Sequence, residues 1–100
     1  MIRTIQLTDA KAIRDISEFS LGYKTTEAVT ERQIAKLISD NRHFIRVYED
    51  DETHTVVGFI HAEAYELLYK EPGFNILGLA LLSEYQHKGI GKQLVQALEA

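Results

Sequence analysis

The sequence predicts one small α/β (α+β) domain in which helices flank a β-sheet. Its 100 residues can build a single hydrophobic core but not two independent cores. Hydrophobic residues make up 45% and charged residues 26% of the chain, a globular rather than a disordered composition. Helix-like and strand-like apolar patterns alternate along the chain in the order β-α-α-β-β-β-α.

The first half of the chain predicts a short strand and two helices. Residues 1–6 form the strand. The next helix begins at a side-chain cap from Thr8 or Asp9, carries apolar residues at three- and four-residue spacing, and ends at Gly22. A second apolar stripe of the same spacing predicts another helix within residues 25–41.

The second half begins with three predicted strands. Residues 43–48 and 55–65 are rich in β-branched and aromatic residues, and the acidic run 49–52 between them predicts a solvated turn. Glu71-Pro72-Gly73 predicts a second turn. Residues 74–82 are almost continuously apolar, which is typical of a strand that helices cover on both faces.

An amphipathic helix closes the chain. Its stripe of Ile90, Leu94 and Leu98 is still in phase at Ala100, and no Gly or Pro signals a stop. A helix after a buried strand normally leads back to a further parallel strand. We therefore expect residues 1–100 to be the N-terminal portion of a single larger domain.

Composition and charge exclude several classes of protein. Fifteen acidic and eleven basic residues give a net charge of -4, which disfavours nucleic acid as a partner. The chain has no Cys, and its four His residues have no metal-ligand spacing, so we expect no disulfide and no metal. No apolar stretch reaches the roughly 18 residues of a membrane span, and the start lacks a signal-peptide core. We expect a soluble, cytoplasmic protein without a membrane partner.

Residues 79–92 combine the features of an anion site. A buried strand leads through a short polar connection to Gly89 and Gly91 and then into a helix. Glycines let the backbone approach a ligand closely, and the first N–H groups of a helix lie unpaired at the positive end of its dipole. Lys88 and Lys92 add positive charge in an acidic chain. Phosphate is the usual occupant of such a site.

Two phosphate-binding signatures do not fit this loop. A P-loop requires a glycine where Gln86 stands and a hydroxyl where Gln93 stands. The dinucleotide-binding fingerprint requires a third glycine where Leu94 stands. The pattern that fits is Gln-x-x-Gly-x-Gly over residues 86–91, preceded by Leu79-Ala80-Leu81.

In this loop, in the strand before it and in its order of elements, the chain resembles the GCN5-related N-acetyltransferase (GNAT) family. The family's pyrophosphate loop reads Arg or Gln, two residues, Gly, one residue, then Gly or Ala. The resemblance covers the whole chain in element order and is most specific over residues 77–95. It implies the acyl-CoA N-acyltransferase fold, with a mixed, mainly antiparallel sheet whose C-terminal strands are missing here. It also implies transfer of an acetyl group from acetyl-CoA to a primary amine of a small molecule or peptide.

The resemblance implies a site for acetyl-CoA as cosubstrate. Backbone groups of Leu79, Ala80 and Leu81 would pair with the pantetheine arm as a neighbouring strand would, and the N–H near Leu81 would polarise the thioester carbonyl. The loop would hold the pyrophosphate, mainly through backbone amides; its residues are Gln86, His87, Lys88, Gly89, Ile90, Gly91 and Lys92. Ser83 departs from the family, in which many members have Pro. The family's fifth strand and its thiolate-protonating tyrosine have no counterpart in these 100 residues.

Acetyl transfer requires a neutral amine, and a Lys-like amine with a pKa near ~10.4 costs roughly 4.6 kcal/mol to deprotonate at pH 7. A carboxylate acting as general base contributes about 10²–10⁴-fold. We expect Glu63 to be this base, because period-two alternation places it on one strand face with His61 and Tyr65. A solvent-facing position is the alternative for Glu63, and Glu84 is a second candidate.

A non-catalytic function stays open at this point. A truncated module could bind CoA or serve in assembly without turnover. An unpaired strand edge and an unmatched helix face predict self-association, and we expect a homodimer. The acceptor stays unidentified, because one scaffold serves many acceptors.

Overall fold

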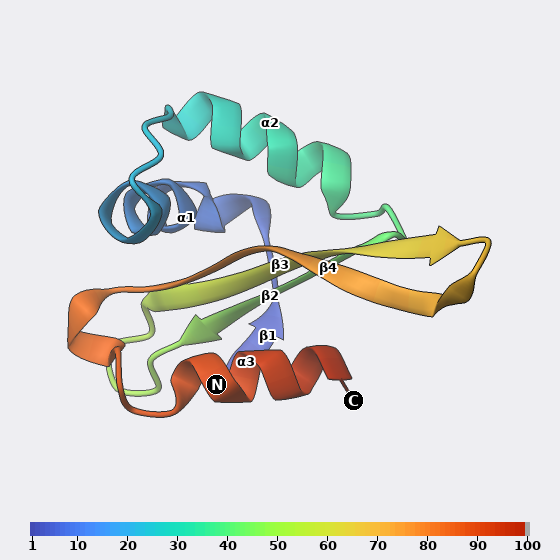
Figure 1. Cartoon of the computed structure of the whole chain (residues 1–100). Coiled ribbons are helices and arrows are strands. Elements are labelled where there is room, and N and C mark those ends of the chain that lie inside the picture. Colours follow the sequence, from blue (N-terminus) through green and yellow to red (C-terminus); the bar gives the residue numbers. More distant parts are fainter. Residues whose placement is uncertain (100) are drawn as a thin grey trace.

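Four antiparallel strands form one sheet in the computed structural model, which describes residues 1–99 (Figure 1). Each strand pairs with the next one along the chain, so the spatial order is β1-β2-β3-β4. The strands are β1 (Ile2–Thr4), β2 (His43–Glu49), β3 (Val56–Leu67) and β4 (Lys70–Leu81).

Helices cover both faces of this sheet (Figure 1). The α-helices are α1 (Ala10–Ile16), α2 (Glu27–Leu37) and α3 (Ile90–Glu99). Helices α1 and α2 pack on one face and α3 on the other, and the predicted order β-α-α-β-β-β-α is confirmed. Among residues 1–99, no helix has the length and apolar character needed to cross a membrane.

The predicted first helix contains three types of helical turn. A 3₁₀ turn, η1 (Leu7–Asp9), precedes α1, and a π-helical segment, η2 (Ser17–Leu21), continues it. Gly22 ends this stretch as predicted, with a left-handed φ of 74°. Helix α2 is capped by Thr26, whose hydroxyl accepts a hydrogen bond of 3.1 Å from the Val29 amide.

The sheet separates two apolar clusters. Phe59 of β3 is buried against the α1–α2 side, together with Ile16 and Ile34. The next residue, Ile60, is buried on the opposite side with Leu94 of α3. Alternating side chains of β3, one of the two inner strands of the sheet, therefore supply both cores.

The predicted turn at Glu71-Pro72-Gly73 is wrong. These residues lie in β4, and the chain reverses earlier, where Leu67 pairs with Lys70. Pro72 has no N–H to donate. It lies in an irregular part of the β3–β4 ladder, where it has no partner in the strand register. Gly73 lies opposite Tyr65, whose hydroxyl would be 2.8 Å from a Cβ at that position. The glycine therefore makes room for the tyrosine instead of making a turn.

The sequence predicts that helices cover both faces of residues 74–82. In the structure, only the end of β4 is covered in this way. Ala80 is buried, but Phe74, Ile76 and Leu77 are about half exposed, at 47%, 47% and 52%. The first half of β4 and the end of β3 form a two-stranded arm that extends past the helices (Figure 1). Local apolar character cannot reveal this, since it depends on how far the helices reach.

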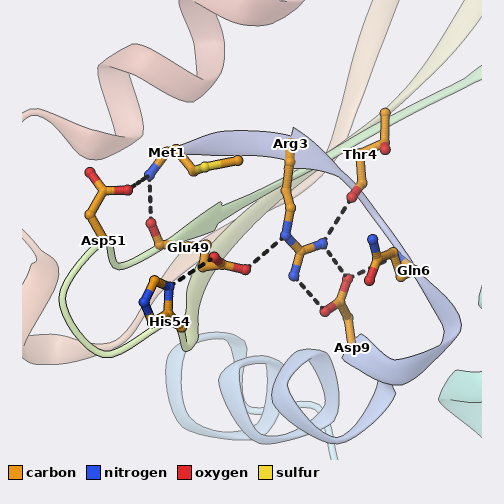
Figure 2. Close-up of polar contacts among 8 residues, drawn as sticks. All are labelled: Met1, Arg3, Thr4, Gln6, Asp9, Glu49, Asp51 and His54. Carbon is orange, nitrogen blue, oxygen red and sulfur yellow. Dashed lines mark hydrogen bonds and ion pairs between the residues drawn. The ribbon is translucent and has the colours of Figure 1, made fainter.

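The side-chain cap predicted from Asp9 is not formed. The Asp9 carboxylate instead accepts two hydrogen bonds of 2.9 Å from the Arg3 guanidinium and one of 2.8 Å from the Gln6 amide (Figure 2). Arg3 also donates to Glu49, at 2.9 Å, and Asp9 is only 5% exposed. Two ion pairs that share Arg3 thus join β1, the η1 turn before α1 and the end of β2.

We expect Asp9→Asn to lower the free energy of unfolding by about 2 kcal/mol, since the buried carboxylate loses its charge-assisted hydrogen bonds with Arg3, which keeps only Glu49 as an acidic partner. Urea denaturation followed by circular dichroism measures this loss. The matched control is Asp15→Asn, whose ion pair with Lys11 is exposed to solvent and should contribute little. Equal losses in the two variants would show that the Arg3 pair has no special role.

Candidate functional site

A groove of about 430 Å³ lies between the end of β4 and the start of α3. It is lined by Ser20, Leu79, Ala80, Leu81, Gln86, His87, Gly89, Gly91 and Lys92. Eight of the ten residues predicted to bind the cosubstrate therefore line one continuous surface.

The side chains of the other two residues lie elsewhere. Ile90 is 5% exposed and packs with Ile60 and Leu94 in the core beneath α3. Lys88 places its Nζ atom 5.6 Å from the centre of the Tyr85 ring and lines a separate, acidic pocket. The prediction concerned mainly backbone amides of the loop, so for these two residues it stays open.

The backbone of the loop has an unusual conformation just before α3. His87 and Gly89 have left-handed φ angles of 63° and 83°. The first hydrogen bond of the helix runs from the Gln93 amide to the Gly89 carbonyl, at 3.1 Å, so the amides of residues 89–92 have no acceptor within α3. A Cβ at Gly89 would meet no atom within 4 Å, so that side of the loop is open. Together these amides can hold an anion at the positive end of the helix dipole.

Two side-chain hydrogen bonds hold the loop in place. The Gln86 side-chain amide donates to the Leu81 carbonyl, at 3.1 Å, and the Tyr85 hydroxyl donates to the Asp50 carboxylate, at 2.6 Å. Asp50 also accepts from the amides of Glu52 and Thr53. These bonds, the Tyr85 bond foremost, lower the pKa of Asp50. The acidic run predicted to be a solvated turn therefore contains an anchor for the loop.

A β-bulge interrupts β4 next to the groove. His61 pairs with Gly78 and Ala62 pairs with Ile76, which leaves Leu77 as an extra residue on β4. Residues 79–81 pair with β3 on one side, and within residues 1–99 no strand pairs with their other side. Backbone N–H and C=O groups on that free edge can bind an extended ligand as a further strand would.

Glu63 belongs to a row of three titratable side chains. Nε2 of His43 lies 3.5 Å from Oε2 of Glu63, and Nδ1 of His43 lies 2.9 Å from Nε2 of His61. His61 and Glu63 thus share a face, as period-two alternation predicts. Burial lowers the pKa of His61 below its usual value, and His43 lowers it further. No group of three or more His, Asp or Glu in residues 1–99, this one included, could hold a metal ion.

Sequence reasoning missed His43, because it lies on a different strand. It is placed opposite Glu63 by the register of β2 with β3. Glu84, the second candidate base, lines the acidic pocket beside Tyr85 and not the groove. Its carboxylate accepts a hydrogen bond of 3.0 Å from the Ser83 hydroxyl.

Two comparisons of the sequence with known proteins agree. Residues 10–100 match the model of the acetyltransferase (GNAT) family. An uncharacterized N-acetyltransferase of Chlorobaculum tepidum is 32% identical over 99 residues, which cover 99% of this chain and 57% of that protein. The chain therefore spans little more than half the length of this curated relative.

Solved structures show the same fold. A GNAT family acetyltransferase of Staphylococcus aureus has a TM-score of 0.79 and 20% identity, over 99% of this chain and 74% of that one. An aminoglycoside antibiotic 6'-N-acetyltransferase of Acinetobacter baumannii has a TM-score of 0.83 and 21% identity, over 99% and 68%. The family model, the curated relative and these folds lead to one conclusion: the chain belongs to the GNAT acetyltransferase family.

Proposed function

We propose that the chain binds acetyl-CoA and takes part in transferring its acetyl group to a primary amine of a small molecule or peptide. The observation that carries the proposal is the groove, which joins the free edge of β4 to the open amides before α3. Family membership and the name of the curated relative favour the same reaction class.

The residues of the groove suit both parts of the CoA molecule. The diphosphate is an anion and matches the amides of residues 89–92, and Lys92 and His87 are also among the residues that line the groove. The pantetheine arm carries amides in an extended chain, which match the free backbone edge of residues 79–81. Gly89 leaves open the space that a Cβ would fill. Bound acetyl-CoA would supply the activated thioester.

The proton-accepting role falls to Glu63, directly or through an intervening group. Its side chain is 43% exposed, so it can pass a proton to water. It lies on the same strand as His61, which pairs with Gly78 next to the groove-lining residues. Glu84 is less suited, because it lines the acidic pocket on the other side of the loop.

One feature favours a second candidate function. The β3–β4 arm exposes apolar side chains near its turn, and Leu68 and Tyr69 are more than 80% exposed. Such a surface suits a non-catalytic CoA-binding or assembly module, and the homodimer and the larger domain stay predictions. Binding of CoA without turnover of any amine is the result that this candidate requires.

We expect CoA and acetyl-CoA to raise the melting temperature, since ligand at 100 times its Kd adds about 2.7 kcal/mol of stability. Gly89→Val should abolish this rise, because a branched side chain would occupy the open side of the loop. The control is Gly22→Val, since Gly22 has a similar φ of 74° and also no atom within 4 Å of a Cβ. It should lose comparable stability through backbone strain and keep the response to CoA. Equal shifts with ATP, NAD and CoA would argue against the proposal.

Acetyl transfer itself is measured by the release of CoA from acetyl-CoA in the presence of an alkyl diamine, an amino sugar or a lysine-containing peptide. For an amine that is acetylated, we expect Glu63→Gln to lower kcat/KM by about 10–100-fold, toward the lower end of general-base effects. Glu66→Gln is the matched control, because Glu66 is an exposed carboxylate on the same strand. An unchanged rate in Glu63→Gln would remove this residue from the mechanism.

A further inference from the structure

The geometry points to His61 as the group that takes the proton from the acceptor amine, with His43 and Glu63 as a relay behind it. This inference rests on the proposed function and names the residue that contacts the acceptor. In it, Glu63 and His43 are positioning residues, and only His61 touches the substrate.

The contacts among the three side chains select one pattern of protonation. The negative charge of Glu63 lies 3.5 Å from Nε2 of His43 and favours the tautomer with a hydrogen on that nitrogen. Nδ1 of His43 then carries a lone pair and accepts from Nε2–H of His61, at 2.9 Å. The one remaining nitrogen, Nδ1 of His61, is left with a lone pair. The row of contacts therefore makes this atom a proton acceptor.

His61 also has the right position along the sheet. It pairs with Gly78, and cross-strand partners share one face. Gly78 itself has no side chain on this face, where the Phe59 ring and Leu21 lie 3.4 and 3.9 Å from the position of a Cβ. The groove-lining residues 79–81 follow directly, at about 3.3 Å per residue. The groove-lining residue next to the partner of His61 is thus Leu79, and the inference places the acceptor amine over this face of the sheet, beside His61.

The surroundings of His61 keep it ready to accept a proton. On the side of α2, the imidazole shares a cavity of about 200 Å³ with the neutral side chains of Thr30, Gln33 and Ile34. The titratable groups that face it are His43 and Glu63. Its lowered pKa leaves it neutral at pH 7, and the row toward Glu63 stabilises the imidazolium when it forms.

The protons balance over the whole reaction. The acceptor arrives as an ammonium ion, and its first N–H bond breaks as Nδ1 of His61 gains that proton. Nε2–H of His61 can then pass a proton to His43, and Nε2–H of His43 can pass one to Glu63 and on to water. As the nitrogen–carbon bond forms and the carbon–sulfur bond breaks, the amine's second proton ends on the departing thiol.

The first experiment needs no acceptor. Nitrogen-15 NMR of the labelled imidazoles should show His61 with its proton on Nε2 and a bare Nδ1 at pH 7. We expect Glu63→Gln to lower the titration midpoint of His61, because the carboxylate charge that stabilises its imidazolium is lost. A proton on Nδ1 of His61, or a His61 midpoint that is unchanged in Glu63→Gln, would overturn the relay.

The second experiment uses any amine that the wild-type protein acetylates. We expect His61→Asn to lower kcat/KM at pH 7 by about 10²–10⁴-fold and to remove the acid limb of its pH profile. Glu63→Gln should move that limb to lower pH, because the carboxylate charge that raises the pKa of His61 is lost. His43→Asn should lower the plateau, because it interrupts the relay between His61 and Glu63. The affinity for CoA, measured by calorimetry, should stay unchanged in all three variants. The control is His54→Asn, an exposed histidine with a left-handed φ of 59°, which asparagine tolerates.

The outcomes separate this inference from the proposed function. Normal turnover in His61→Asn would overturn the relay and leave acetyl transfer intact. Failure of the wild-type protein to bind CoA would overturn the proposed function itself. Binding of CoA without turnover of any amine would favour the non-catalytic module, and the relay would then have no role.

Discussion

The one-sided pairing of β4 determines where the candidate site of this domain lies. Strand β4 pairs with β3 across the hairpin, and in residues 1–99 its other edge is free. The bulge at Leu77 falls between the exposed arm and the covered end of the strand. Beyond it, residues 79–81 carry their free backbone groups along the groove. The hydrogen bonds between β3 and β4 thus determine three features: the position of the groove, the bulge, and the pairing of His61 with Gly78.

The loop after β4 keeps its strained shape because it is tied at two points. A left-handed φ at a residue other than glycine costs of order 1 kcal/mol, and His87 has one. The Gln86 bond to the Leu81 carbonyl ties the loop to its own strand, and the Tyr85 bond ties it to the β2–β3 turn through Asp50. The open amides of residues 89–92 are therefore oriented before any ligand arrives, which reduces the entropy lost on binding.

Local pattern predicted the order of elements and most of the groove, because both depend on residues close together in the chain. The glycines and the strand before them are contiguous, so their spacing alone places them in one surface. The errors arose at residues whose conformation or contacts depend on another part of the chain. Gly73 makes room for Tyr65 across the ladder, and Asp9 binds Arg3 of β1 instead of capping its own helix. His43 reaches Glu63 through strand register, which a single sequence does not contain.

The charges around the loop show why fixed dipoles matter more than lysines here. Lys88 lies over the Tyr85 ring and lines the acidic pocket with Asp50 and Glu84, not the groove. Of the two lysines next to the glycines, only Lys92 lines the groove. In the proposed function, the remaining attraction for a diphosphate would come from backbone N–H groups, which carry no counter-ion. An acidic chain can hold an anion in this way because the local field of a helix start outweighs the distant net charge of -4, which salt screens.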